Sequence, residues 1–407
     1  MGAQQGHEGK RRKLSKLKKT DTVVPCVPSS LCPCCGDSHI AINQKPSYRH
    51  QVHEIPEPIV NITEYQVFHG RCQNCQTSVK GKRPQDTPQG IMGPNLMSYI
   101  ALLAGQFHLS VRKIQELLKL QLGTSFSTGA ISEAQGKVSS MLTPLHQAVR
   151  DAIQKAPMVH IDETSHIRNG ESSLRWCWLM SSDDWVYERV LFSRSTHSAK
   201  VMLNEKFAGV VISDQCASYN WLNPEKHQFC LGHLKRNLQQ MADYSGGGGL
   251  TAFIGKRLTL LINMIFRTQH RYEENISAEI YFRRMKRLRK SLTRWLHKGA
   301  DVTTSRYSGR CKFILKHEVS LWVFLTAPLT IPLTNNEAER RLRGSVIMRK
   351  ISFGTSSDRG DKFRGRIHTL VETCKKRSMS PFIALQQIVN AVVKKQPYPD
   401  IFNLCSG

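Results

Sequence analysis

Two pairs of cysteines, each with two intervening residues, give the clearest chemical signal in the sequence. The first pair is Cys32 and Cys35, in the run CPCCG, and the second is Cys72 and Cys75, in CQNC. Two such turns aim four thiolates at one ion, which is the tetrahedral set that structural zinc takes. We therefore predict one zinc on these four cysteines, helping a small domain to fold. The alternative is a pair of turns with reduced surface thiols. Other nearby side chains could replace a ligand: Cys34, His39, His50, His53 and His69.

A second group of residues consists of acids that follow apolar runs. Asp162 follows MVHI, and Asp214 follows GVVIS. If the two runs are neighbouring strands of one sheet, their carboxylates can share divalent cations such as Mg²⁺, which prefer oxygen ligands. The competing explanation is local, because Asp at the end of a strand often caps a helix or forms a turn.

A third acid could come from the run NNEAER, which contains Glu337 and Glu339. In a helix, Glu339 shares one face with Arg343, Val346 and Lys350. This face would place an acid and two cations along one stripe. The alternative is an exposed helix in which Glu339 and Arg343 form an ordinary ion pair.

A fourth motif is the run CLGH, which contains Cys230 and His233. This spacing can supply half of a metal site, but the neighbouring sequence contains no second half. A buried pair that stabilises the fold is therefore the favoured interpretation, and we predict a structural role for both residues.

The charge of the chain limits its partners. The 407 residues contain 58 Lys and Arg against 31 Asp and Glu, which leaves a formal net charge of +27. Such an excess favours a polyanionic partner, most simply nucleic acid. The 40% apolar content is enough for ordinary cores, and no apolar run is long enough for a membrane span. Twelve cysteines without a secretory signal indicate metal ligands and reduced thiols.

The elements that would position these residues follow from periodicity. Residues 95–156 have helical spacing with breaks near Leu109–Ser110 and Gly123–Thr128. The next runs are typical of strands, with one short helix before the fourth: MVHIDET, RWCWLMSS, WVYERVLFS and GVVISDQ. After Asp214 the chain becomes helical and basic, with 12 Lys and Arg against 3 Glu in residues 251–300. Helices are expected over 334–350, 363–378 and 380–395.

In these motifs the chain resembles bacterial transposases of the insertion sequence sixty-six family. The resemblance rests on five segments that occur in the family's order: CPCCG with CQNC, HIDETSHIRNG with RWCWLM, VISDQCASY, QFCLGHLKRN, and TNNEAERRLRGSVIMRKISFGTSSDRG. It implies an α/β fold with an RNase H-like catalytic core of the DDE type. The three acids of the family fall on Asp162, Asp214 and Glu339, and not on Glu337. The second cysteine pair departs from the pattern, because Gln76 follows it where a glycine would ease the turn.

The resemblance also implies a domain order and a chemistry. The expected parts are a basic flexible tail (1–25), a zinc-ribbon domain (26–80), a linker (81–94), a helix-turn-helix-like DNA-binding region (95–156), a catalytic core (157–378) with a helical insertion at about 235–330, and a C-terminal helical tail (379–407). Two Mg²⁺ or Mn²⁺ ions would bind the three acids, and Arg343, Arg349 and Lys350 would contact DNA phosphates.

The function that this resemblance implies is DNA transposition. The partners would be the element's ends, target DNA, further copies of the chain and accessory proteins of the same element, with no membrane. The expected location is the bacterial cytoplasm, at the nucleoid. Two alternatives remain open at this point: a DNA-binding derivative without catalysis, and a nuclease that cleaves without joining.

Overall fold

The computed structural model of the chain describes residues 22–28, 31–39, 41–53, 60–246 and 249–404. The expected basic tail therefore lies outside the described residues as far as residue 21. The chain forms two units, residues 1–61 and 62–407, and each is described by itself.

The first unit contains the first cysteine pair in a tight turn. The backbone N–H of Gly36 donates to the carbonyl of Cys32 at 2.9 Å, and the N–H of Cys32 donates to the carbonyl of Asp37 at 2.8 Å. Gly36 has a φ of 74°, a left-handed conformation that glycine adopts without steric cost. The described residues of this unit contain neither a helix nor a strand.

The second unit begins with a hairpin that carries the second cysteine pair. Strands β1 (His69–Arg71) and β2 (Ser78–Lys80) pair antiparallel on either side of it. The backbone hydrogen bonds of the first turn recur here. The N–H of Gln76 donates to the carbonyl of Cys72 at 2.8 Å, and the N–H of Cys72 donates to the carbonyl of Thr77 at 2.9 Å. Gln76 has a φ of 58°, so a residue with a Cβ stands where the first turn has glycine.

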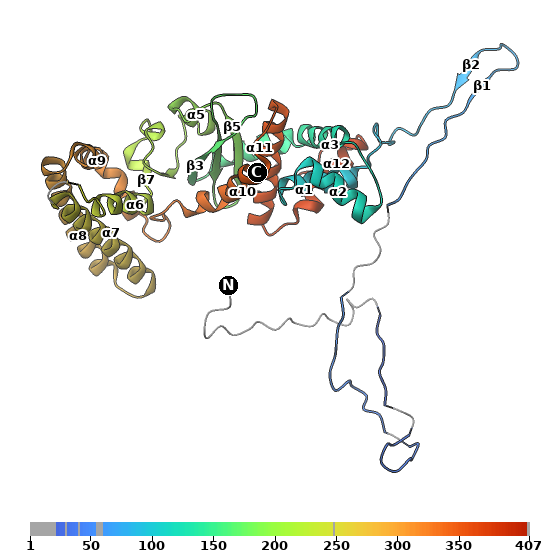
Figure 1. Ribbon diagram of the computed structural model, residues 1–407, viewed down its shortest axis with the longest axis horizontal. Coiled ribbons are helices and arrows are strands. Elements are labelled where there is room, and N and C mark those ends of the chain that lie inside the picture. Colours follow the sequence, from blue (N-terminus) through green and yellow to red (C-terminus); the bar gives the residue numbers. More distant parts are fainter. Residues whose placement is uncertain (1–21, 29–30, 40, 54–59, 247–248, 405–407) are drawn as a thin grey trace. The chain divides into compact units, whose positions relative to one another are not determined.

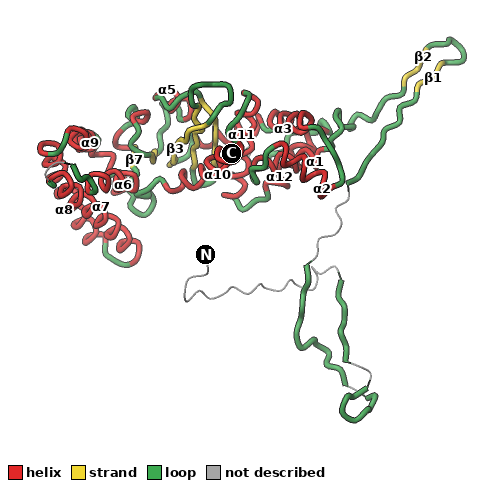
Figure 2. The backbone as a smooth tube through the Cα atoms, viewed as in Figure 1, coloured by secondary structure: helices red, strands yellow, loops and turns green. Residues whose placement is uncertain are grey.

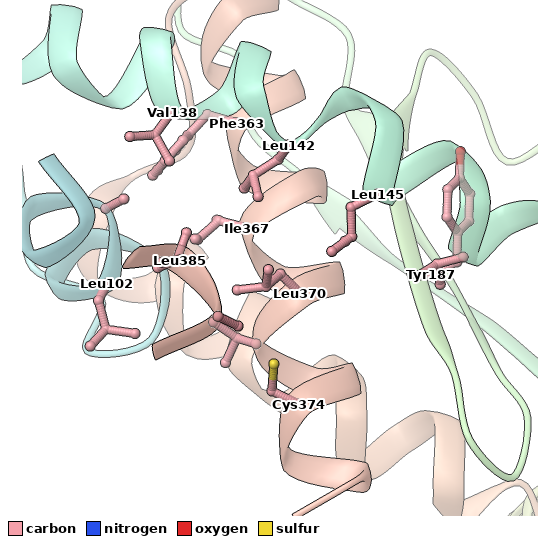
Figure 3. Packing of buried hydrophobic residues seen from close by; sticks show 14 of the residues in the cluster. Leu102, Val138, Leu142, Leu145, Tyr187, Phe363, Ile367, Leu370, Cys374 and Leu385 are labelled. Atoms are coloured by element: carbon pink, nitrogen blue, oxygen red, sulfur yellow. The ribbon is translucent and has the colours of Figure 1, made fainter. Parts of the chain in front are cut away.

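Four helices follow the linker, and their ends confirm the predicted breaks. They are α1 (Pro94–Gly105), α2 (Val111–Leu122), α3 (Thr128–Met141) and α4 (Thr143–Ile153). Gly123 ends α2 in the left-handed conformation, and the Ser127 hydroxyl accepts a bond from the N–H of Ala130 at the start of α3. Leucines and valines of these helices pack against α11 (Asp358–Lys376) and α12 (Pro381–Val393) (Figure 3).

A five-stranded mixed sheet forms the centre of the second unit. Its strands are β3 (Met158–His166), β4 (Arg175–Ser181), β5 (Val186–Leu191), β6 (Val210–Ser213) and β7 (His227–Phe229). The order across the sheet is β5-β4-β3-β6-β7. β3, β4 and β5 pair antiparallel, whereas β6 runs parallel to both β3 and β7. All four predicted strand runs are therefore strands of one sheet, together with β7.

Alternation along β4 explains how helices cover both faces of the sheet. Trp178 and Met180 join the core cluster that contains residues of α11, while Cys177 and Leu179 pack with Ala338 and Leu342 of α10. Successive side chains of a strand point to opposite faces, so one strand contributes to both layers. The helices involved are α5 (Thr196–Met202), α10 (Asn336–Ser352), α11 (Asp358–Lys376) and α12 (Pro381–Val393) (Figure 1).

The segment predicted to be a basic insertion is helical and lies at the β7 side of the sheet. It contains α6 (Leu231–Ala242), α7 (Leu250–Glu274), α8 (Ala278–Val302) and α9 (Ser305–Lys316), which pack in sequence order (Figure 2). The hydrophobic core of these helices includes Ile212 of β6 and Phe229 of β7, so the helices pack against this edge of the sheet. Along α8 the buried residues recur every three or four positions, which leaves the opposite face to cations.

No helix among the described residues has the length and apolar character needed to cross a membrane.

Candidate active site

The strand register aligns Asp162 with Asp214. His160 of β3 is paired with Ile212 of β6, and the same parallel offset continued two residues further matches Asp162 with Asp214. We expected both acids at strand ends. Asp214 does follow the last residue of β6. Asp162 instead lies inside β3, because pairing with β4 extends that strand to His166.

The electrostatics of Asp162 indicate a concentration of negative charge. Burial, followed by the charges of Glu163 and Asp214 and then that of Glu339, raises the pKa of Asp162 to about 8. One hydrogen bond, from the backbone N–H of Glu163 at 2.9 Å, opposes this shift. A bound cation would relieve such repulsion, because it favours the ionised form of every acid around it.

Glu163 is a member of the site that the sequence analysis missed. Its side chain is fully buried and accepts hydrogen bonds from Arg194 and from the hydroxyl of Tyr219. Arg194 also donates to Asp214 at 3.1 Å. Carboxylate oxygens of Glu163 and Asp214 and the sulfur of Cys216 lie within 4.8 Å of one another. The adjacent acid in DET was visible in the sequence, but two neighbours on a strand are expected to face opposite sides.

The third predicted acid, Glu339, lies in the first turn of α10 and contacts α6. Its carboxylate is 3.3 Å from Nε2 of His233 and 3.2 Å from Nη2 of Arg236. Ligand atoms of Cys230, His233 and Glu339 lie within 4.8 Å of one another. Among the described residues, no group at this spacing contains all three predicted acids, although the charge of Glu339 acts on Asp162.

Asn335 connects the elements that carry the acids. Its buried amide donates to the carbonyl of Ile161 at 2.9 Å and accepts from Nδ1 of His160 at 3.0 Å. Its backbone N–H donates to the sulfur of Cys230 at 3.2 Å. One side chain and its backbone thereby attach the start of α10 to β3 and to the start of α6. The sequence signal was the doubled Asn in NNEAER, at the start of a predicted helix.

Glu337 occupies a different environment from Glu339. It accepts from Lys376 at 2.8 Å, from Arg341 at 3.0 Å and from the hydroxyl of Ser181 at 3.2 Å. The bonds from Lys376 and Arg341 outweigh burial and lower the pKa of Glu337 to about 2. This acid is neutralised by cations of the fold, so it has little capacity left for a metal or for DNA.

Comparison with known proteins identifies the family of this chain. The sequence profile described as "Transposase IS66 family" matches residues 89–362, which include Asp162, Asp214 and Glu339. The chain belongs to this family. It is also 23% identical over 414 residues to the uncharacterized protein y4hP of Sinorhizobium fredii (strain NBRC 101917 / NGR234), covering 93% of this chain and 73% of that protein. Family membership supports a transposase-related function.

In this transposase family member, the three cations predicted to contact DNA differ in their surroundings. Arg343 and Lys350 are exposed on α10, and neither forms an ion pair with a described residue. Arg349 instead points to β3, where it donates to the carbonyl of Ser165 at 2.7 Å and to Thr164 Oγ1 at 3.2 Å. The structure therefore leaves two cations free along the predicted stripe and gives the third a contact within the fold.

The cysteine turns precede the segment matched by the family profile. Hydrogen bonds from Thr77, with a smaller contribution from Cys72, lower the pKa of Cys75 to about 7. Backbone N–H groups of Cys35 and Cys34 lower the pKa of Cys32. Each turn thus favours the thiolate, which is the form that binds metals.

Proposed function

We propose that this protein is a DDE-type DNA transposase that cleaves the ends of its element and joins them to target DNA. The observation that carries the proposal is the alignment of Asp162, on β3, with Asp214, which directly follows the parallel strand β6, with the charge of Glu339 acting on Asp162. The mixed sheet, with the first acid on its central strand and helices on both faces, supports an RNase H-like core. The helical segment between Asp214 and Glu339 would be an insertion into that core.

The acids suit a divalent metal of the hard type. Asp162, Asp214 and Glu339 would hold two Mg²⁺ or Mn²⁺ ions, and Glu163 adds a further oxygen donor beside Asp214. When bound, such ions activate the attacking oxygen and stabilise the leaving oxygen of a phosphodiester. Metal binding would favour the ionised form of Asp162 against the burial and the surrounding charges that raise its pKa.

The remaining residues of the site would orient the acids. Arg194 bridges Glu163 and Asp214 and so limits the rotamers of both carboxylates, whereas Arg236 makes a more exposed contact with Glu339. Asn335 sets the position of α10 relative to β3. Arg343 and Lys350 would neutralise DNA phosphates, which sets affinity and register but carries no sequence information. No covalent link between protein and DNA is needed, so no Ser or Tyr nucleophile is assigned.

We further propose zinc for the cysteine turns, with a structural role. The support is the identical hydrogen-bond pattern of the two turns and the lowered pKa values of Cys32 and Cys75. The assignment of Cys32, Cys35, Cys72 and Cys75 to one ion rests on the sequence spacing. A Cys72→Ser, Cys75→Ser variant with unchanged zinc content, measured by elemental analysis, would exclude it.

We also propose separate DNA-binding roles for helices α1–α4 and for α8. Helices α1–α4 would read the element's ends, because α2 and α3 are joined by a short turn between Gly123 and Ser127. The exposed cations of α8 would add affinity without sequence preference. Binding of both element ends would bring copies of the chain together on DNA.

Replacement of the acids tests the catalytic proposal. We expect cleavage and joining to be abolished by each of three variants: Asp162→Ala, Asp214→Ala and Glu339→Ala. Affinity for DNA should be retained, because each variant removes a negative charge from the protein. Glu337→Ala is the matched control from the same helical turn, and it should instead destabilise the fold by about 1–3 kcal/mol, since Lys376 and Arg341 each lose one of their acceptors. Equal loss of activity in the Glu337 and Glu339 variants would show that the third acid is misassigned.

The products distinguish the alternatives. A transposase yields a free 3′-OH at the element's end and a joined strand in target DNA. A nuclease of the same fold yields only the cut, and a DNA-binding derivative yields neither. Inverted repeats and a short target duplication in the DNA flanking the gene would give independent support to the first of these.

A further inference from the structure

The motif CLGH acquires a third potential ligand in the folded chain. Cys230 and His233 lie at the start of α6, and Glu339 reaches them from α10, more than a hundred residues further along. The sulfur, an imidazole nitrogen and a carboxylate oxygen lie within 4.8 Å of one another. Tetrahedral zinc needs ligand atoms only slightly closer than this, so small side-chain rotations would complete a three-ligand site.

The local hydrogen bonding leaves these atoms available. Nδ1 of His233 is buried and has no hydrogen-bond partner among the described residues, and Nε2 faces the carboxylate of Glu339 at 3.3 Å. A metal ion between the imidazole of His233 and the carboxylate of Glu339 would replace their 3.3 Å contact with two metal–ligand bonds. Arg236 also contacts Glu339, but its side chain is more than half exposed and can move away at little cost.

The surroundings of Cys230 allow it to serve as a ligand. The backbone N–H of Asn335 donates to its sulfur at 3.2 Å. This donor would stabilise the thiolate once a cation has displaced the proton. The bond that breaks is S–H, the bond that forms is sulfur to metal, and the proton goes to solvent.

We propose that Cys230, His233 and Glu339 form a zinc-binding site that competes with the catalytic arrangement of the acids. A thiolate, an imidazole and a carboxylate are the donor set of Zn²⁺, whereas Mg²⁺ takes oxygen ligands and avoids sulfur. The fourth position stays open to water. Zinc would draw Glu339 toward α6 and withhold it from Asp162 and Asp214. Zinc is therefore an inhibitor of this chain; this second part rests on the proposed function, whereas the binding itself does not.

Cobalt binding to the full-length protein tests the site directly. Co²⁺ replaces zinc and produces a near-ultraviolet charge-transfer absorption when a thiolate is bound. The titration is made on the Cys72→Ser, Cys75→Ser background, which removes two of the four thiols of the cysteine turns. Adding Cys230→Ser should remove one thiolate-bound cobalt per chain. Cys311→Ser is the matched control, because this buried thiol lies in α9 against Gly299 and is not part of the Cys230 group.

Two further variants keep the test decisive if Cys230→Ser does not fold. His233→Gln and Glu339→Gln alter partly exposed side chains, and each should weaken the Cys230-dependent cobalt binding at least tenfold. Unchanged stoichiometry and absorption in the Cys230 variant, or in both of the others, would overturn the proposal.

Inhibition is measured separately, by titrating zinc into a magnesium-dependent cleavage reaction. Cobalt binding that depends on Cys230, in a protein without any cleavage activity, would support the metal site while the proposed function fails. Cleavage that is insensitive to zinc at concentrations that saturate the site would overturn the inhibitory part.

Discussion

At the residue scale, buried polar side chains decide how the elements of the site are joined. Asn335 is the clearest case, because it bonds to residues of β3 and to Cys230 while it precedes α10. Buried amides are stable only when their bonds are satisfied, so the geometry of this residue is strongly constrained. Its neighbour Asn336 is exposed and starts the helix.

We predict that Asn335→Ala destabilises the protein by about 2–4 kcal/mol, because the buried carbonyl of Ile161 and Nδ1 of His160 lose their partner. Cleavage should fall as well, since α10 no longer holds Glu339 in place. Chemical denaturation and a cleavage assay measure the two effects. Asn336→Ala is the control and should change stability by less than about 0.5 kcal/mol; a similar loss in both variants would contradict the role of Asn335.

His146 provides a pH-dependent prediction away from the acids. Its Nε2 donates to the carbonyl of Glu188 at 2.9 Å, and burial lowers its pKa to about 4. A folded pKa below the unfolded value means that stability is lost as pH falls from about 6.5 towards 4. Between pH 7 and pH 5 the loss from this residue is about 2 kcal/mol. Denaturation curves at both pH values should show that His146→Gln, which retains a donor, removes this part of the pH dependence.

At the element scale, the two cysteine turns show how one backbone geometry is reached from different residues. Gly36 and Gln76 occupy the same position and both have positive φ, but only glycine does so without cost. The Gln76 side chain offsets part of this cost with a bond to the carbonyl of Gln73 at 3.1 Å.

We predict that Gln76→Gly stabilises the metal-bound turn by up to about 1 kcal/mol, and that Gly36→Ala destabilises its turn by about 1 kcal/mol or more. Competition with a zinc chelator would show tighter binding for the first variant and weaker binding for the second. Nothing lies within 4 Å of a Cβ placed on Gly36, so the expected loss comes from backbone conformation alone. Zinc affinities that move in the same direction in both variants would contradict this explanation.

At the scale of the whole molecule, the excess positive charge includes a cluster of cations on α8. The six cations of α8 between Arg283 and Lys290 are all exposed. Arg289 forms a bidentate pair with Glu318, and Arg283 lies 3.8 Å from Glu279. The other four have no acidic partner among the described residues. Little of the charge of these six residues is therefore neutralised within the fold.

We predict that changing these four residues to Ala (Arg284, Lys286, Arg287 and Lys290) weakens binding to element-end and unrelated DNA about equally. The slope of log affinity against log salt should fall by roughly one unit for each phosphate that the variant no longer neutralises. Arg289→Ala is the control, because its charge is already paired, and it should change the slope little. Identical slopes in wild type and the fourfold variant would exclude α8 as a DNA-binding surface.

The sequence by itself determined the features that depend on local patterns. Local patterns predicted the helical stretch after Asp214 and the strands of the sheet. Gly123 and Ser127 predicted the break between α2 and α3, and the spacing of Cys32 and Cys35 predicted a tight turn. Each depends on residues a few positions apart, so steric preference and burial of one face decide it.

Only the tertiary structure decided which residues meet across long sequence separations. It placed Glu163 beside Asp214, turned Arg349 toward β3 and brought Glu339 to Cys230 and His233. The motif at Cys230 looked incomplete because its third member follows the whole helical insertion. Such contacts depend on how helices pack on the sheet, and no local pattern encodes that packing.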